Sequence, residues 1–428
     1  AVTSTVERPS PSRAQRVGGA PGTWLPERLR PVAERFDSPV TSYYVLLGVT
    51  TALLLIGLVM VLSASMITAY KDDGSSYAVF LNQVKFAALG LVGFAVASRL
   101  SITWWKRLAL PSLALAVVLQ ALVFVPALGL SKGGNRNWLR LGAGLSLQPS
   151  ELTKIGLVLV GALILSNKRA LLGRASHAVV PYLVPIAAVT IGLVLVGHDL
   201  GTALVLMGIV GAVMYAAGVP ARLFVAAAGV VAAVAVALVV TSANRMDRIG
   251  NWLSGSCTDP NGECGQSVHG LYALADGGWW GVGLGASKEK WSWLPEAHND
   301  FIFAIIGEEL GLPGTFVILA LFGLLATACY RIVTRCTDQF VRIGAAGAMA
   351  WILFQAMINI GAVIGLLPVI GVPLPLVSAG GSALVTTLLA MGMLVSFARS
   401  EPGAAEILAA RPGVIQRSLA VLPRRRRG

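Results

Sequence analysis

Charged residues are scarce in this chain: only 12% of its 428 residues are Asp, Glu, Lys or Arg, whereas about 25% is usual in soluble domains. Hydrophobic residues make up 56%. Apolar runs of about 20 residues recur along the sequence, which is the length that an α-helix needs to cross a bilayer. The short alternating segments of a membrane β-barrel are missing. We therefore expect an all-α, polytopic membrane protein.

Ten candidate spans follow from these runs, with a long outer loop at 242–300 between the seventh and the eighth. A loop of that length is too long for a mere connector. The first 40 residues lack an apolar period and read as a disordered cytoplasmic arm, and 401–428 read as a basic cytoplasmic tail. No cleavable signal peptide is visible. The spans are predicted at about 43–69, 79–98, 107–128, 151–167, 178–197, 200–217, 221–241, 301–330, 343–365 and 382–398.

Acidic residues are outnumbered, with 20 Asp and Glu against 33 Lys and Arg and a net charge of +13. This excess does not indicate a nucleic-acid partner, because the cations gather in alternate short loops and in the tail. By the positive-inside rule, both termini are cytoplasmic, and the tail is placed to touch anionic lipids. Lys132, Arg136 and Arg140, in one predicted outer loop, break the rule. They are either tolerated exceptions or contacts for an anionic ligand.

Cysteine is also rare, with four residues. Cys257 and Cys264 flank a short turn in the outer loop, where an oxidising compartment allows a disulfide between them. Cys329 and Cys336 lie at the cytoplasmic end of the eighth span. No second Cys or His pair stands at zinc spacing, so the sequence gives no support for a zinc site.

Ionisable residues cluster at the outer mouth of the eighth span, in the segment KWSWLPEAHNDFIFAIIGEELG at 290–311. Acids in or beside hydrocarbon are costly, which makes them functional candidates. Asp300 stands at the water boundary. If the helix begins near Asn299, the face below Asp300 is small (Ala304, Gly307, Gly311) and either leaves room for an acyl chain or packs against a helix.

Glu308 and Glu309 lie inside the same span and need partners there. Lys85, Lys154 and Arg136 are the candidate partners. A structural ion pair is at least as reasonable for these two acids as a catalytic role.

Other polar residues are expected on the outer side. Lys154 lies in the first turn of the fourth span, where a helix start attracts anions. Asp199 either caps the sixth span or belongs to a site. Five tryptophans in the outer loop either rest on lipid head groups or form a platform for a sugar-bearing substrate. The apolar stretch 365–381 contains three prolines and four glycines, so we expect a non-helical, re-entrant wall of a cavity.

Four stretches of the chain resemble, in order, motifs of the SEDS family (shape, elongation, division and sporulation), the integral-membrane peptidoglycan polymerases. The ten-span topology with a large outer loop before the eighth span agrees with this resemblance. Within the family, PEAHNDFIFAIIGEELG is more similar to the division branch, FtsW, than to the elongation branch, RodA. His198, Asn299 and Ala379 depart from the residues common in the family. The four stretches are GNRNWLRLG…LQPSELTK at 134–154, DLGTAL at 199–204, GLGASKEKWSWLPEAHNDFIFAIIGEELG at 283–311 and NIGAVIGLLPVIGVPLPLVSAGGSAL at 359–384.

The resemblance implies polymerisation of lipid II, an undecaprenyl-pyrophosphate-linked disaccharide-pentapeptide, into septal glycan strands, with inversion at the donor's anomeric carbon. The family's essential acid corresponds to Asp300, which suits a general base for the acceptor hydroxyl. A class B penicillin-binding protein, a transpeptidase, is the implied partner, together with other membrane proteins of the division machinery.

Further residues are candidates for that chemistry. A divalent cation, Mg or Mn, would share the charge of the leaving pyrophosphate, with Asp199 and Glu151 as candidate ligands. Glu296 and His298 are candidate substrate contacts beside Asp300, and Trp138 is a candidate for stacking on a sugar. The cations expected near the pyrophosphate are Arg136, Lys154, Arg140 and Lys85.

Three other functions stay open from the sequence. An elongation polymerase would share the chemistry. A lipid II flippase fits the broken backbone and buried acids, which are typical of transporters. A non-catalytic scaffold for division proteins would keep the motifs without activity. The clustering of charged elements on the outer side, and the absence of an evident internal repeat, favour the enzyme.

Overall fold

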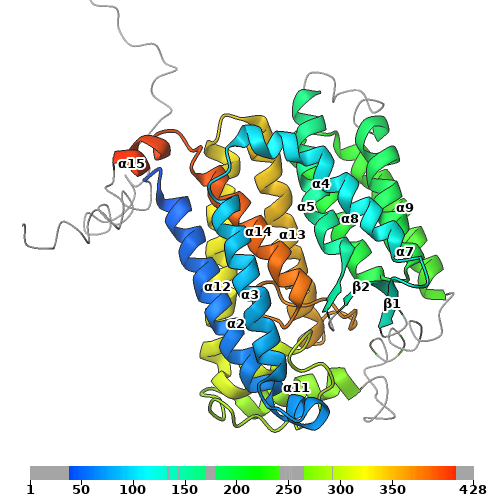
Figure 1. Cartoon of the computed structure of the whole chain (residues 1–428), viewed down its shortest axis with the longest axis vertical. Helices are drawn as coiled ribbons and strands as arrows, with labels where there is room; N and C mark the ends of the chain where they lie inside the picture. Colours follow the sequence, from blue (N-terminus) through cyan, green and yellow to red (C-terminus); the bar gives the residue numbers. More distant parts are fainter. Residues whose placement is uncertain are drawn as a thin grey trace, which may run out of the picture.

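The computed structural model describes residues 38–132, 135–142, 145–168, 179–240, 246, 250, 252, 265–291 and 293–410. Each of the ten predicted spans coincides with a helical element, and Figure 1 shows these elements side by side in one bundle. Eight of the described helices are long and apolar enough to cross a membrane. The elements are α2 (Thr41–Asp73), α3 (Ala78–Ala97), α4 (Ile102–Leu122), α5 (Pro149–Asn167), η3 (Val179–Ala187) with α7 (Ala188–Val196), α8 (Leu200–Ala217), α9 (Ala221–Val240), α12 (Ile302–Arg335), α13 (Gln339–Val363) and α14 (Gly381–Ala398).

The helices α5, α13 and α14 are the most buried of these spans, whereas α3 presents most of its surface outward. Outward apolar side chains suit a helix that faces lipid, because lipid tails are as apolar as the side chains themselves. Small residues let α3 and α14 approach closely. A Cβ at Gly392 would lie 2.7 Å from the carbonyl oxygen of Phe94.

The first and last described segments of the chain lie at one end of the bundle, which we call the terminal end (Figure 1). There Arg331 donates to the carbonyl of Ser38 at 3.1 Å, and Arg399 donates to that of Ser98 at 3.1 Å. The short helix α15 (Ala404–Ala410) lies at this end in Figure 1. Arg331 and Arg399, from two of the predicted basic loops, therefore lie at the same end of the bundle, as the charge pattern requires.

The opposite end, which we call the loop end, carries a small antiparallel sheet in the order β1-β2-β3. Its strands are β1 (Gly129–Lys132), β2 (Asn135–Gly142) and β3 (Leu145–Leu147). The sequence interpretation, which excluded only the strand pattern of a membrane barrel, did not identify this small sheet. Its strands pair with their chain neighbours, and Asn137 ties β2 to the bundle: this buried side chain accepts from Gln120 at 2.9 Å and donates to the carbonyl of Gly197 at 3.1 Å.

The non-helical backbone predicted for 365–381 is confirmed, with bounds of 364–380 in the structure, because α14 already begins at Gly381. Polar side chains of the surrounding helices bond its backbone, as buried irregular backbone requires. Gln83 of α3 donates to the carbonyl of Ser378 at 3.1 Å, and Gln355 of α13 donates to that of Pro373 at 2.9 Å. Because Leu374 and Val377 are buried, this stretch is an internal wall of the bundle.

The helix α12 is broken at Gly311, whose φ of 66° and ψ of −162° are not helical. Pro313 follows two residues later and lacks the N–H that a continuous helix would use. In the described part of the outer loop, helix α11 (Gly265–Gly277) packs against α12.

Several predictions lie outside the described residues. They are the Cys257–Cys264 disulfide, most of the arm and the final 411–428 of the tail. Cys329 and Cys336 are described, and both are free and buried thiols.

Candidate functional site

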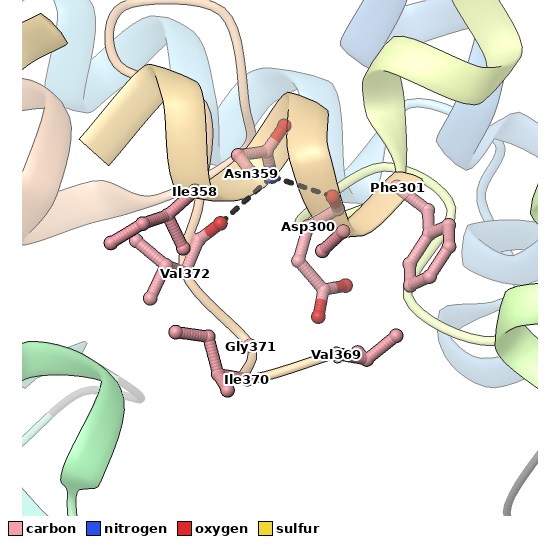
Figure 2. Close-up of a pocket in the computed structure, with 9 residues that line it drawn as sticks. Asp300, Phe301, Ile358, Asn359, Val369, Ile370, Gly371 and Val372 are labelled. Atoms are coloured by element: carbon pink, nitrogen blue, oxygen red, sulfur yellow. Dashed lines mark hydrogen bonds between the residues drawn. The ribbon is translucent and has the colours of Figure 1, made fainter. Parts of the chain in front are cut away.

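Asp300 lies just before α12, which begins at Ile302, and so stands at the mouth of the eighth span as expected; the helix begins later than Asn299, the start assumed from the sequence. Its side chain points toward the non-helical stretch 364–380 (Figure 2). A Cβ built at Gly371 would lie 3.8 Å from Asp300 Oδ2. The pocket between them contains about 190 Å³ of empty space, counting the part open to solvent. It is lined by Asp300, Phe301, Ile358, Asn359, Ala362, Val369, Ile370, Gly371 and Val372.

Asn359 of α13 fixes the backbone on both sides of this pocket. Its Nδ2 donates to the carbonyl oxygen of Asp300 at 2.6 Å and to that of Val372 at 2.8 Å (Figure 2). The side chain is buried, so these bonds are shielded from water. The sequence interpretation missed Asn359. The available signal was a polar amide within an apolar span, which calls for a partner inside the bundle.

The small face below Asp300 packs against the outer loop. A Cβ on Gly307 would lie 2.4 Å from a methyl carbon of Leu274, and one on Gly277 would overlap the Gly307 carbonyl. Of the two interpretations of this face, helix packing is therefore the one that the structure supports. Gly311 leaves the face because the helix breaks there.

The residues just before Asp300 are fixed by short-range contacts. Asn299 donates to Glu296 Oε2 at 3.2 Å, and the backbone N–H of Ala379 donates to the carbonyl of His298 at 2.9 Å. Burial lowers the pKa of His298, and the charge of Glu296 partly opposes that shift. Glu296 is exposed and His298 half-buried, so both side chains remain candidate substrate contacts.

Asp199 caps α8, one of the two roles expected for it. Its carboxylate accepts from the Thr202 N–H at 2.9 Å and from the Thr202 hydroxyl at 2.7 Å, and Gln148 donates to it at 3.0 Å. Burial raises the pKa of Asp199, whereas the hydrogen bonds from Thr202 and the charge of Lys154 act to lower it. The start of α8 also touches the stretch 364–380, because a Cβ on Gly201 would lie 2.8 Å from the Ile370 carbonyl oxygen.

Lys154 lies in a buried ion pair. Its Nζ is 2.7 Å from Glu151 Oε1, with both side chains at most 3% exposed. The same Nζ donates to Gln355 Oε1 at 3.0 Å and stands 5.4 Å from the centroid of the Trp351 ring. Thr386 donates to the other oxygen of Glu151 at 3.3 Å. These contacts join α5, α13 and α14 behind the pocket. A contact of Lys154 with pyrophosphate stays a prediction.

The other predicted cations lie apart from that pair. Arg136 donates to the carbonyl of Phe124 at 3.2 Å, near the end of α4, while Arg140 on β2 and Lys85 on α3 are exposed. Trp138 is half-buried on β2. Within the described part of the chain, no group of three or more His, Cys, Asp or Glu is arranged to hold a metal ion. A divalent cation at Asp199 and Glu151 therefore stays a prediction.

Glu308 and Glu309 are paired with the outer loop, and the three partners predicted for them were wrong. Glu309 lies 3.0 Å from Lys290 Nζ, and the Ser63 hydroxyl of α2 is 2.7 Å from both of its oxygens. Glu308 accepts from the Ser287 hydroxyl at 2.5 Å and from the Lys288 N–H at 2.6 Å. The structural ion pair was correctly expected for Glu309. Its partner was missed because only folding of the loop brings Lys290 to α12.

Aromatic side chains surround this region of the outer loop. Trp279, Trp280 and Trp291 are exposed, while Trp293 stacks on His269 at 6.0 Å between ring centroids. His269 in turn lies 2.8 Å from Glu289. The loop end thus presents exposed aromatic surface on the outer loop, and it also holds Asp300 at its pocket. A carboxylate so placed is suited to accept a proton from a bound hydroxyl.

Comparison with known proteins agrees with this chemistry. The family model described as "Cell cycle protein", which covers FtsW, RodA and SpoVE, matches residues 44–402. A protein of Mycobacterium tuberculosis named "Probable peptidoglycan glycosyltransferase FtsW" is 40% identical over 409 residues, covering 94% of this chain and 75% of the relative. A protein of the same name from Trichlorobacter lovleyi is 38% identical over 353 residues, covering 82% and 92%.

Solved structures share the fold. The rod shape determining protein RodA of Thermus thermophilus superposes with a TM-score of 0.61 and 27% identity, covering 83% of this chain and 96% of that one. A chain of a peptidoglycan synthase complex that coordinates polymerization and crosslinking gives a TM-score of 0.67 at 26% identity, covering 83% and 96%. The predicted resemblance is confirmed, and the chain belongs to the FtsW, RodA and SpoVE family of multi-pass membrane proteins.

Proposed function

We propose that this chain polymerises lipid II into glycan strands and that Asp300 is the general base. The observation that carries the proposal is the place of Asp300: a carboxylate at the mouth of α12, facing a small pocket, with its backbone fixed by Asn359. The chain is a peptidoglycan glycosyltransferase of the FtsW type, as the names of its relatives indicate.

The proposed reaction needs a base for the attacking hydroxyl and stabilisation of the negative charge on the leaving pyrophosphate. The acceptor's sugar hydroxyl attacks the donor's anomeric carbon and gives its proton to Asp300, while the bond from that carbon to the pyrophosphate breaks. The pyrophosphate leaves with the electron pair, and the configuration at the carbon inverts. Arg136, Arg140 and Lys154 are our candidates to stabilise the negative charge that develops, alone or with Mg or Mn.

The proposed orientation puts the loop end outside the plasma membrane and the terminal end in the cytoplasm. It is supported by the meeting of Arg331 and Arg399 at the terminal end, since such residues favour the cytoplasmic side. The sheet, the outer loop and Asp300 then face the compartment in which glycan strands are assembled.

A class B penicillin-binding protein is the partner that we propose, and the division septum the location. The support for the partner is the structural likeness to a chain of a synthase complex that couples polymerization to crosslinking. The support for division, against elongation, is the run of relatives named FtsW. A fluorescent fusion at midcell supports the division role, and a fusion along the side wall contradicts it.

The direct test incubates the purified chain with lipid II and the class B partner in detergent and measures polymer on a gel. We expect Asp300→Asn to reduce polymer about 10²–10⁴-fold, the usual contribution of a positioned base. Asp276→Asn, which changes an exposed acid of α11, is the matched control and should retain activity. Wild-type activity of Asp300→Asn contradicts the assigned role, and no polymer from the wild-type complex contradicts the polymerase function itself.

A further inference from the structure

The outer loop folds back on α12 at the point where that helix breaks. Because Pro313 has no N–H, the carbonyl of Glu309 lacks its usual helical donor. The N–H of Gly283 takes that place at 3.0 Å, and the N–H of Val282 donates to the carbonyl of Glu308 at 2.9 Å. The broken turn of α12 is therefore bonded to the loop through its own backbone.

This contact excludes side chains at two glycines. A Cβ on Gly281 would lie 2.3 Å from the Glu309 carbonyl oxygen, and one on Gly311 would lie 2.4 Å from the Gly281 nitrogen. Both glycines also have positive φ, at 75° and 66°. The two backbones thus touch directly, which fixes the height of the loop along α12.

The side chains of Glu308 and Glu309 bind the following part of the same loop. Ser287 and the Lys288 N–H donate to Glu308. Lys290 reaches Glu309 at 3.0 Å, with side-chain exposures of 1% and 0%, and Ser63 of α2 bonds the same carboxylate. We call this group of five residues the latch: Ser63, Ser287, Lys290, Glu308 and Glu309.

Together with the covalent chain, the latch holds the segment that contains Asp300 at both of its ends. The segment 290–300 is tied to α12 at its start through Lys290 and Glu309, and at its end through the covalent chain. Near its end, two residues before Asp300, the segment is also tied to the stretch 364–380 by the bond from the Ala379 N–H to the His298 carbonyl. We propose that the Lys290–Glu309 ion pair is a positioning device for Asp300, holding the segment so that the carboxylate keeps its place at the pocket. This inference rests on the proposed role of Asp300.

The energetics favour positioning over simple stabilisation. A buried ion pair adds little compared with a well-packed apolar pair, because desolvation of both charges offsets their attraction. It does penalise any shift of the loop, since separated partners leave a bare charge in apolar surroundings. Misplacement of a reacting group by about 1 Å costs about 10²-fold in rate. The Lys290–Glu309 ion pair therefore affects kcat by keeping Asp300 in place.

The test separates position from stability with three variants in complex with the partner. Lys290→Met leaves Glu309 buried and unpaired, and we expect lower Tm and lower kcat. Lys290→Met with Glu309→Gln removes both charges and keeps an acceptor for Ser63; we expect Tm to recover while kcat stays at least about tenfold low and KM for lipid II stays within about twofold. Leu325→Ala, at a fully buried site in the remote half of α12, supplies a loss of Tm without touching the latch.

Hydrogen exchange supplies a readout that needs no activity. We expect faster exchange over 285–300 in both latch variants, but not in Leu325→Ala. Recovery of kcat together with Tm in the double variant overturns the inference, as does an equal loss of kcat in Leu325→Ala at the same Tm. Unchanged exchange over 285–300 overturns it as well. If Asp300→Asn were active, the proposed role of Asp300 as general base would fail, while the exchange result would still show whether the latch holds the loop.

Discussion

The two ends of the bundle treat charge in different ways. At the terminal end, Lys106 and Asp338 form a pair at 2.8 Å whose side chains are 38% and 35% exposed. At the loop end, the pairs Lys154–Glu151 and Lys290–Glu309 are at most 3% exposed. A solvent-exposed ion pair contributes little to stability and tolerates movement, whereas a buried ion pair enforces one geometry. Enforced geometry is concentrated at the end that holds Asp300.

The backbone shows the same contrast. Toward the terminal end, α12 continues as a regular helix to Arg335, whereas toward the loop end it breaks at Gly311. The non-helical stretch 364–380 and the small sheet also lie at the loop end. Irregular backbone costs free energy and persists only where its surroundings fix it, which is typical of functional regions.

The largest expected difference between the two ends comes from removing the cation of a buried ion pair and, for comparison, the cation of an exposed one. Lys154→Met leaves Glu151 buried without its cation and should cost about 3–5 kcal/mol of unfolding free energy. Lys106→Met, the matched control, should cost about 0–1 kcal/mol because water already solvates Asp338. Thermal unfolding of both variants in the same detergent measures the difference, and equal losses would remove the distinction between the ends.

The break in α12 gives a second, smaller test. Gly311→Ala places a Cβ against the Gly281 nitrogen at a positive φ and should destabilise by about 1–3 kcal/mol. Gly323→Ala lies in the regular half of the same helix, where a Cβ meets nothing within 4 Å. It should be neutral or stabilise by up to about 1 kcal/mol, since alanine favours helix. A neutral Gly311→Ala would show that the break is not fixed by this contact.

The pH dependence at the loop end is expected to be the smallest effect. Burial lowers the pKa of His298 below its usual 6.5, so the folded protein keeps the ring neutral where the unfolded chain takes a proton. Stability should therefore be full above about pH 6.5 and decline as pH falls from there toward the folded pKa. Comparing Tm at pH 7.5 and 5.5 (chosen to bracket about 6.5) tests this, and His298→Gln should shrink the difference. An unchanged difference in that variant assigns the effect to another group.

The sequence predicted the features that depend on local pattern. The ten spans follow from apolar length, and the break at 364–380 follows from Pro368, Pro373 and Pro375. Asp199 as a helix cap follows from its place before α8. In each case, the residues that decide the structure are neighbours in the chain.

What the sequence left out depends on contacts between distant segments. Lys290 meets Glu309 only after the outer loop folds back, and Asn359 meets Asp300 only after α13 packs beside the start of α12. The sheet was also missed, although β2 pairs with its chain neighbours β1 and β3; only the bond from Asn137 to the remote Gly197, which ties β2 to the bundle, depends on a distant segment. Pro313 was visible as a helix breaker, but the partners for the freed carbonyls come from the loop.

The measurement that most directly tests the central claim, that the chain holds one carboxylate in one place, is the polymerisation rate of Asp300→Glu. This variant keeps the charge and moves the carboxylate outward by one methylene group. We predict a rate about 10²-fold below wild type, with lipid II binding retained, because placement and not charge alone is what the structure enforces. A rate close to that of the wild-type protein would contradict the account.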